Sequence, residues 1–250
     1  MPRLIRFAPA LALAALLGGA PGHAADNSTQ VDRKAVEQII HDYLLNHPEV
    51  LIEALKAADD KLKAEQESQN RIALHAKQGE LLHDPNSPVG GNPKGDVTLV
   101  EFFDYRCPYC KQVEPDLEAL IKEDPKLRIV YKEFPILGPE SVLATRVALA
   151  ALKQGADKYT RFHTAMMNTK GQITEAVIMK VAADSGLDMN RIKTDTKSAQ
   201  IDAAIKRNYD LAEALDIKGT PAIIVGETLT PGAIDLDGMR KLVADARAPR

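Results

Sequence analysis

The chain has 250 residues, of which 45% are hydrophobic and 27% are charged, and these ordinary globular proportions exclude extended disorder. This length allows one large domain or two small ones with a substantial core. The formal net charge of −3 gives no basis for nucleic-acid binding, so we expect no nucleic-acid partner.

The N-terminal segment has the pattern of an export signal. Arg3 and Arg6 precede the short apolar run "LALAALL", and small residues follow it, so we expect residues 1–24 to be removed by cleavage near Ala24 or Ala25. The apolar run is far shorter than the ~20 residues that span a bilayer, which disfavours the alternative of a retained membrane anchor. Export would place the protein in the periplasm, where disulfides form and persist.

The next segment has a helical pattern. Apolar residues at positions 36, 39, 40, 43 and 44 form one face of a first helix that ends at Pro48, and a second helix runs from about Glu49 to near Gly79. A stripe this narrow cannot form a core of its own. We therefore expect residues 25–79 to be a helical arm that either packs against its own domain or pairs with other copies of the chain. The heptad pattern is too weak to predict a strong coiled coil.

The remaining residues, 80–250, begin with an α/β pattern. A cluster of Pro, Gly, Asn and Asp at 83–96 predicts a loop. After it, "VTLVEFF" predicts a strand, "CPYCKQVEPDLEALIKED" predicts a helix, and "LRIVYKEF" predicts a second strand.

A long helical stretch interrupts this pattern. Residues 139–215 are almost entirely helical in pattern, in four segments broken near Gly155, Gly171 and Gly186. The run "AIIV", a strand near 228–233 and a last helix from Asp237 then complete the chain. The predicted order is β-α-β, helical insertion, β-β-α.

Cys107 and Cys110 are the only cysteines of the chain. A disulfide between them would close too small a loop to stabilise the fold much. They are also only half of a zinc site, which no His-x-x-x-His pair completes, so we expect neither a metal nor a cofactor. At a helix N-terminus the unsatisfied N–H groups and the helix dipole lower a thiol's pKa from about 8.5. We therefore predict a redox pair in which Cys107 is the exposed nucleophile and Cys110 is the buried thiol that resolves the mixed disulfide.

Two flanking features support this chemistry. Glu101 lies in the apolar strand before Cys107, where a buried carboxyl would have a raised pKa and could exchange a proton with Cys110, unless it points to water. Thr220 and Pro221 begin a strand, one of the few sheet positions that tolerate proline. Beside the thiols, the Thr220 backbone could bind a substrate peptide as an added strand. Only about 5–6% of X-Pro bonds are cis, so this segment by itself favours a trans bond.

Residues 81–250 resemble a DsbA-type thiol–disulfide oxidoreductase in "EFFDYRCPYC", "RIVYKEFPILG" and "KGTPAIIV". The resemblance implies an α/β thioredoxin fold with a helical insertion, preceded here by the helical arm. It implies the nucleophilic and resolving roles for the two cysteines and a buried acid at Glu101. It also implies a cis-proline loop at Thr220 and Pro221, which would reverse the preference for a trans bond.

The dipeptide between the cysteines departs from the best-known oxidases of that family, which have Pro-His. Pro108 is expected at a first-turn position, where its missing N–H costs nothing. Tyr109 has no imidazole to stabilise the thiolate, so we expect a less oxidising pair. Both residues are expected to lie along the substrate groove.

The stretch "IIHDYLLNHPEVLIEAL" is similar to the N-terminal segment of the ScsC-like and Com1-like branch. The resemblance implies that residues 31–79 mediate self-association, with a trimer favoured and a dimer as the alternative. Some members of that branch shuffle disulfides rather than only insert them.

The leading hypothesis is therefore a periplasmic disulfide isomerase or reductase. Its partners would be cysteine-containing exported proteins and a membrane redox protein that reduces or reoxidises the cysteine pair. The alternatives are a DsbA-like dithiol oxidase recharged by a quinone-linked membrane partner, an envelope protein that binds Cu(I) through its soft cysteine ligands, and an oligomeric scaffold or chaperone. A cytosolic glutaredoxin shares Cys-Pro-Tyr-Cys but has neither an export signal nor a helical insertion.

Overall fold

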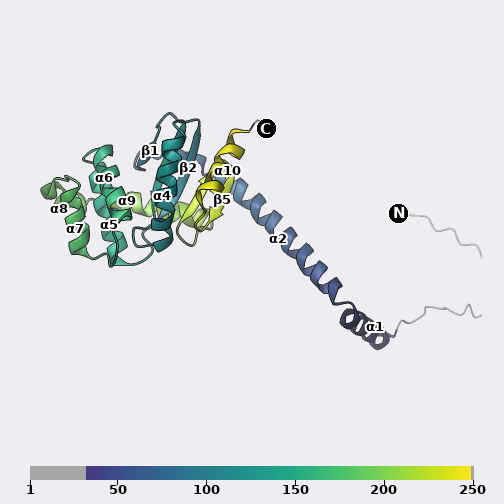
Figure 1. Ribbon diagram of the computed structural model, residues 1–250. Helices are drawn as coiled ribbons and strands as arrows, with labels where there is room; N and C mark the ends of the chain where they lie inside the picture. The colour runs from purple at the N-terminus through teal and green to yellow at the C-terminus, as the bar shows by residue number, and fades with distance from the viewer. Residues whose placement is uncertain (1–31, 249–250) are drawn as a thin grey trace, which may run out of the picture. The chain divides into compact units, whose positions relative to one another are not determined.

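The computed structural model describes residues 32–248 of the chain (Figure 1). The signal segment expected at residues 1–24 lies outside the described residues. The chain divides into two compact units, of which the first ends at Ala57 and the second begins at Ala58. Among the helices of residues 32–248, none combines the length and the apolar character that a membrane span requires.

The described part of the first unit is helical. It comprises α1 (Arg33–Asn46) and the first residues of α2 (Pro48–Ala76). Asp32 caps α1 by accepting a hydrogen bond from the backbone N–H of Lys34, and Pro48 opens α2 at a position where a proline fits. No side chain of α1 is buried. The apolar face expected from the sequence is therefore exposed on this chain, with Ile39 68% and Ile40 and Tyr43 each 52% exposed.

A five-stranded sheet with the order β1-β3-β2-β4-β5 is the centre of the second unit. The central strand β2 (Val97–Phe103) pairs in parallel with β3 (Leu127–Glu133) and in antiparallel fashion with β4 (Ala222–Val225), which pairs with β5 (Thr228–Pro231). The strands predicted from the apolar runs are thus confirmed.

The edge strand β1 (Val89–Gly91) lies where the sequence predicted only a loop. It contains two glycines, which are poor strand formers, so the sequence pattern does not predict a strand there. Glycine is required at position 91, where φ is +62° and the Leu127 carbonyl oxygen lies 2.5 Å from the place of an added Cβ. Tertiary packing against β3 therefore outweighs local preference here.

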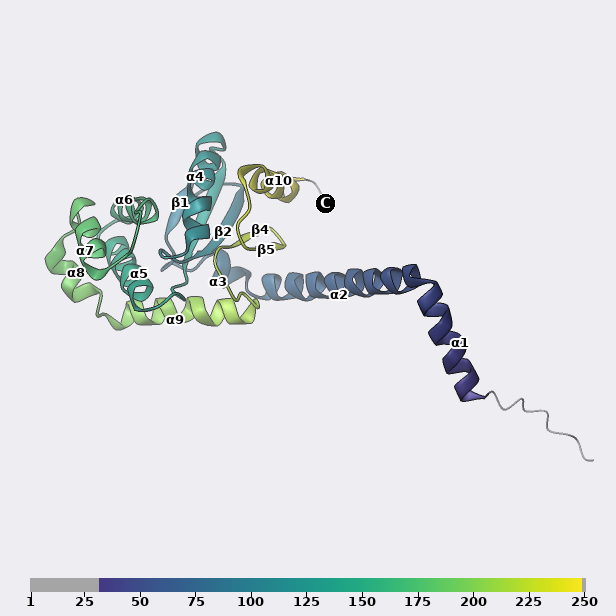
Figure 2. The same ribbon diagram turned by 60° about the horizontal axis from the view of Figure 1, so that its bottom comes forward.

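The alternation of side chains along β2 divides them between two layers. Leu99 and Phe103 pack with α4 (Pro108–Glu123) and α10 (Leu236–Arg247), whereas Val100 and Phe102 pack on the opposite side. That side is covered by the end of α2, α3 (Gln78–Leu82) and α9 (Ala199–Ala214), and Figure 2 shows α9 across the sheet from α4. Glu101 shares its face of the strand with Leu99 and Phe103. It therefore points toward α4, the helix that carries the cysteines.

The predicted helical insertion connects β3 to β4. Its breaks near Gly155, Gly171 and Gly186 are confirmed, but the described chain has one more helix than predicted, because a further break separates the last two helices. No glycine marks that break. Near it the Thr196 hydroxyl donates to the Ile192 carbonyl at 2.7 Å, a local bond that competes with helix continuation. The helices are α5 (Pro139–Leu152), α6 (Ala156–Met167), α7 (Glu175–Asp184), α8 (Met189–Asp195) and α9.

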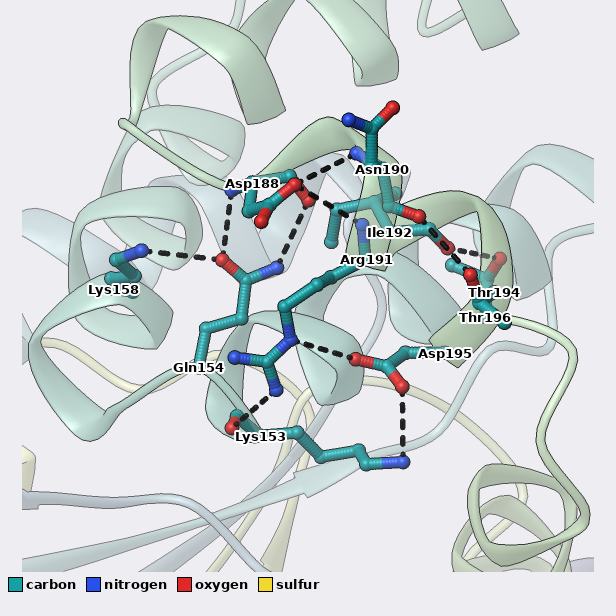
Figure 3. A network of polar contacts seen from close by, with 10 residues as sticks. All are labelled: Lys153, Gln154, Lys158, Asp188, Asn190, Arg191, Ile192, Thr194, Asp195 and Thr196. Atoms are coloured by element: carbon teal, nitrogen blue, oxygen red, sulfur yellow. Dashed lines mark hydrogen bonds and ion pairs between the residues drawn. The ribbon is translucent and has the colours of Figure 1, made fainter.

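A polar network fixes α8 to the turn between α5 and α6 (Figure 3). The side-chain oxygen of Gln154 accepts a hydrogen bond from the Asp188 backbone N–H at 2.8 Å, and its amide nitrogen donates to the Asp188 carbonyl at 3.2 Å. Asp195 forms ion pairs with Lys153 at 3.3 Å and with Arg191 at 3.7 Å. The contacts of Gln154 with Asp188 and of Lys153 with Asp195 join segments more than thirty positions apart and attach α8 to the turn after α5.

Candidate active site

Cys107 and Cys110 lie at the junction of β2 and α4. Cys107 is the N-cap residue of α4 with an extended backbone, and Pro108 occupies the first turn, as the sequence predicted. The backbone N–H of Cys107 donates to the Asp104 carbonyl at 3.0 Å and closes the turn before the helix. Both cysteines are unpaired thiols, and Cys110 is fully buried one turn into the helix.

The expectation that Cys107 is exposed is wrong. The residue is only 4% exposed, and its Sγ lies 3.2 Å from the Thr220 carbonyl oxygen, to which the protonated thiol donates a hydrogen bond. Thr220 precedes β4, the strand next to β2 in the sheet. Burial of the nucleophile is therefore a product of strand pairing, which the sequence around the cysteines does not reveal.

The environment separates the ionisation of the two thiols. A hydrogen bond with the Cys110 thiol lowers the pKa of Cys107 to about 6, and the backbone N–H groups of Tyr109 and Cys110 contribute to this, while burial opposes it. Burial raises the pKa of Cys110, as do its hydrogen bond with Cys107 and the charge of Glu101. At neutral pH, Cys107 is therefore a thiolate and Cys110 is a thiol.

Glu101 lies in the interior beneath the cysteines. It is 1% exposed, and neither of its carboxyl oxygens has a hydrogen-bond partner among the described residues. Desolvation raises the pKa of Glu101 well above its usual value, and the charge of Glu114 raises it further. The alternative in which this carboxyl points to water is excluded. A buried carboxyl with free oxygens is able to gain or lose a proton within the site.

The peptide bond between Thr220 and Pro221 is cis, as the resemblance implied. Both residues line a largely apolar cavity of about 380 Å³, together with Leu215 and Ile217 at the end of α9 and with Leu229 of β5. We call it the cis-proline cavity. Its place beside Cys107 suits an extended, partly apolar peptide.

Pro108 and Tyr109, the two residues between the cysteines, do not line the cis-proline cavity. Pro108 lines a second cavity, which shares no lining residue with the cis-proline cavity. Tyr109 is 60% exposed and lines neither of these two cavities. The structure thus brings Glu101 and the Thr220 loop to the two cysteines and leaves Tyr109 at the surface.

Sequence reasoning missed Asp104, which organises the turn before Cys107. Its carboxylate accepts hydrogen bonds from the Arg106 backbone N–H at 2.8 Å, the Ser141 hydroxyl at 2.7 Å and the Leu137 backbone N–H at 2.9 Å. These bonds connect the active-site turn to the start of the helical insertion. An aspartate two residues before a turn N–H is a recognisable local signal, but its long-range partners are not.

A buried polar cluster beneath the cysteines was also missed. Glu114 follows Cys110 by one helical turn and lies 3.5 Å from the His163 ring nitrogen Nε2 of the insertion. On the other side of that ring, Tyr105 contacts Nδ1 at 3.2 Å and donates to Glu133 at 3.0 Å. Burial raises the pKa of Glu133 to about 8. The helical period could have located Glu114, whereas nothing in the sequence paired it with His163.

Within residues 32–248 no group of three or more His, Cys, Asp or Glu side chains is placed to hold a metal ion.

Family profiles match both parts of the chain. The profile of the DSBA-like thioredoxin domain matches residues 98–244, which is more than half of the chain. The profile described as the copper resistance protein ScsC N-terminal domain matches residues 32–65. The second match covers α1 and the first part of α2 and agrees with the N-terminal resemblance.

Solved structures show the same relationship. A thioredoxin-like oxidoreductase from Silicibacter pomeroyi is 41% identical, with 69% of this chain and 98% of that chain covered and a TM-score of 0.67. A linker-deletion mutant of Proteus mirabilis ScsC is 28% identical over 90% of this chain and 98% of that one, with a TM-score of 0.66. BcfH of Salmonella enterica Typhimurium is 30% identical over 86% and 96%, with a TM-score of 0.74.

Curated relatives differ in length. An Na(+)/H(+) antiporter, NhaA 3 of Salinispora tropica, is 27% identical over 185 residues, which cover 71% of this chain but only 28% of the antiporter. The thiol:disulfide interchange protein DsbA of Bordetella parapertussis is 30% identical over 158 residues, 62% of this chain and 75% of that protein. Together with the geometry of the cysteine pair, these matches show that the chain belongs to the DsbA family of thioredoxin-fold thiol–disulfide oxidoreductases, as an ScsC-like member.

Proposed function

We propose that the chain is a periplasmic enzyme that isomerises or reduces disulfides in exported, cysteine-containing proteins through Cys107 and Cys110. The observation that carries this proposal is the opposite ionisation of two adjacent thiols. The pKa of Cys107 is lowered to about 6 and the pKa of Cys110 is raised by burial. Such a pair combines a ready nucleophile with a thiol that reacts only when it loses its proton.

The chemistry follows from these positions. The Cys107 thiolate attacks one sulfur of a client disulfide, which forms a mixed disulfide and releases the other client sulfur as a thiolate. In isomerisation, a client thiolate then attacks the mixed disulfide and frees Cys107. In reduction, Cys110 gives up its proton to Glu101 and attacks the Cys107 sulfur of the mixed disulfide, which forms the Cys107–Cys110 disulfide and releases the client sulfur as a thiolate. A membrane redox partner would then reduce the Cys107–Cys110 disulfide.

The arm, residues 25–79, would assemble copies of the chain, with residues 80–250 as the catalytic domain and residues 139–215 as its insertion. The support is the exposed apolar face of α1, which includes Ile39, Ile40 and Tyr43. A trimer is favoured and a dimer is the alternative. Several active sites on one assembly raise the effective concentration of thiolate at a misfolded client.

The test is the recovery of an enzyme whose disulfides have been scrambled, in glutathione buffer. We expect the mature protein to restore its activity faster than buffer alone, and Cys107→Ala to give no acceleration. Failure of the wild-type protein to exceed a monomeric dithiol oxidase would contradict the isomerase assignment.

The second candidate is a DsbA-like dithiol oxidase, which the lowered pKa of Cys107 favours. A stabilised thiolate stabilises the reduced enzyme and so makes its disulfide more oxidising. For this candidate we expect the oxidised protein to oxidise a reduced, unfolded substrate stoichiometrically without glutathione, and a quinone-linked membrane partner to recharge it.

A further inference from the structure

A polar cavity of about 540 Å³ lies beside the active-site turn. Arg106 and Pro108, the neighbours of Cys107 on both sides in the chain, line it. Lys111 of α4 and residues 167–173, between α6 and α7, complete the lining. We call it the insertion cavity. The cavity is therefore lined by both residues that flank Cys107 in the chain.

The charged residues that line the insertion cavity are all cations. They are Arg106, Lys111 and Lys170, and no acidic residue is among the lining residues, all of which belong to the described chain. Arg106 is partly neutralised by Glu140, which lies 3.0 Å from its Nη1. Lys170 is exposed and forms no hydrogen bond or ion pair with any residue between 32 and 248. Its ammonium group is available to a ligand.

The end of α6 does not cancel this positive charge. The C-terminal carbonyls of a helix carry negative partial charge, which would disfavour an anion in the cavity. Here the Lys111 ammonium donates to the carbonyls of Met166, Met167 and Thr169 at 2.7, 3.1 and 2.8 Å. These bonds use its three donors and compensate the carbonyl dipoles without a carboxylate. The charge of Lys111 therefore still contributes to the field of the cavity.

The loop between α6 and α7 leaves room for a ligand. Gly171 has a φ of +80°, and no atom lies within 4 Å of the place of an added Cβ. Gln172 lines the same cavity and is exposed, so the residue next to Gly171 carries an amide group that is open to a ligand. Cations and amide donors around a polar cavity are the chemistry that recognises carboxylates.

We propose that the insertion cavity is a subsite for aspartate or glutamate side chains of the client polypeptide, so that Cys107 reacts preferentially with cysteines that have acidic neighbours in the chain. This inference rests on the proposed function, because the client must first be a thiol–disulfide substrate. The cis-proline cavity takes a different, apolar part of the client, since the two cavities share no lining residue. The pair of cavities would thereby select among client cysteines.

The test uses three short peptides that are identical except for one residue two positions from the cysteine, which is Glu, Gln or Lys. Each cysteine carries a chromogenic thiol in a mixed disulfide. The Cys107 thiolate attacks the peptide sulfur, forms the Cys107–peptide disulfide and releases the chromogenic thiolate, whose appearance gives the rate. At low ionic strength we expect the Glu peptide to react about threefold to tenfold faster than the Gln peptide, and the Lys peptide to react slowest. Added salt should reduce these differences.

Substitutions of Lys170 test whether the preference for the Glu peptide arises in the insertion cavity. Lys170→Gln should lose a large part of the preference for Glu, and Lys170→Glu should favour the Lys peptide. Lys193→Gln is the matched control, because Lys193 is an exposed lysine of α8 that does not line the cavity. It should retain the wild-type preference.

The outcomes separate this inference from the proposed function. Equal rates for the three peptides with the wild-type protein, or a preference that survives in Lys170→Glu, would overturn the subsite while leaving the oxidoreductase intact. No reaction of Cys107 with any of the peptides would overturn the proposed function and the subsite together.

Discussion

The carbonyl oxygen of Thr220 lies 3.2 Å from the Sγ of Cys107, although the two residues are 113 positions apart. The contact follows from the antiparallel pairing of β2 with β4, in which Phe102 opposes Ala222. It places the cis-proline cavity beside the nucleophile. A peptide held along this loop would have its sulfur delivered to Cys107, so the binding and reacting groups of the site come from opposite ends of the catalytic domain.

The hydrogen bond between the two thiols is expected to control the reactivity of Cys107. Cys110→Ala removes the largest contribution to the lowered pKa of Cys107, so this pKa should rise from about 6 by roughly 1–2 units, since hydrogen bonds to charged groups contribute about 1.5–3 kcal/mol. Thiolate absorbance against pH measures it. Cys110→Ser is the control, because its hydroxyl still donates and the rise should be smaller. Identical titrations of the two variants would contradict this role.

The stability of the reduced protein should depend on pH in a defined direction. The pKa of Cys107 is about 6 in the folded state and about 8.5 in an unfolded chain. A lowered pKa contributes stability that is fully present above about pH 8.5 and is lost as the pH falls through about 6. We therefore expect urea unfolding to show that the free energy of unfolding of the reduced protein decreases, relative to that of the oxidised protein, as the pH falls from about 8.5 to about 6.

The thiol that causes this dependence can be identified by substitution. Cys107→Ser carries no ionisable group at this position, so it should abolish that part of the pH dependence. A dependence that persisted in Cys107→Ser would assign it to another residue.

The Glu101 carboxyl should lower the free energy of unfolding at neutral pH. The pKa of Glu101 is raised in the folded state, so the protonated carboxyl favours folding below about pH 4.3. This stabilisation is lost as the pH rises through the folded-state pKa. At pH 8, Glu101→Leu should therefore be more stable than the wild-type protein, by about 1–3 kcal/mol in urea unfolding. The difference should shrink at pH 4, which is the internal control.

The same substitution should impair the resolving step. Without a proton acceptor for Cys110, the mixed disulfide of Glu101→Leu should decay more slowly, by roughly 10²-fold, in a rapid-quench measurement. The first attack by Cys107 should be much less affected. Unchanged decay would exclude Glu101 as the proton acceptor.

The exposed face of α1 should be the contact between copies of the chain. Ile39 is 68% exposed, so Ile39→Glu is expected to leave the helix folded and to lower the oligomeric mass, because a charge would be buried at the contact. Light scattering on the full chain measures this mass. Gln38→Glu is the control, since Gln38 is also exposed and receives the same charge. An unchanged mass in Ile39→Glu, or a monomeric wild-type protein, would contradict assembly through this face.

Much of the fold was predictable because local signals were strong. Continuous apolar runs located β2, β3 and β4, and glycines located most breaks in the insertion. The exceptions were β1, which contains two glycines, and the break between α8 and α9, which has none. At β1 the pairing with β3 outweighs local preference, whereas at the break a local bond from the Thr196 hydroxyl to the Ile192 carbonyl competes with the helix.

For the site, what the sequence by itself determined is the chemistry of the cysteine pair, because its spacing and its position at a helix N-terminus are local properties. Only the tertiary structure decided that Thr220 covers Cys107, that Glu101 is buried without a partner and that Glu114 faces His163. The physical reason is that desolvation and charge coupling depend on which distant segments pack around a group. The distances between such segments cannot be inferred from the order of residues in the sequence.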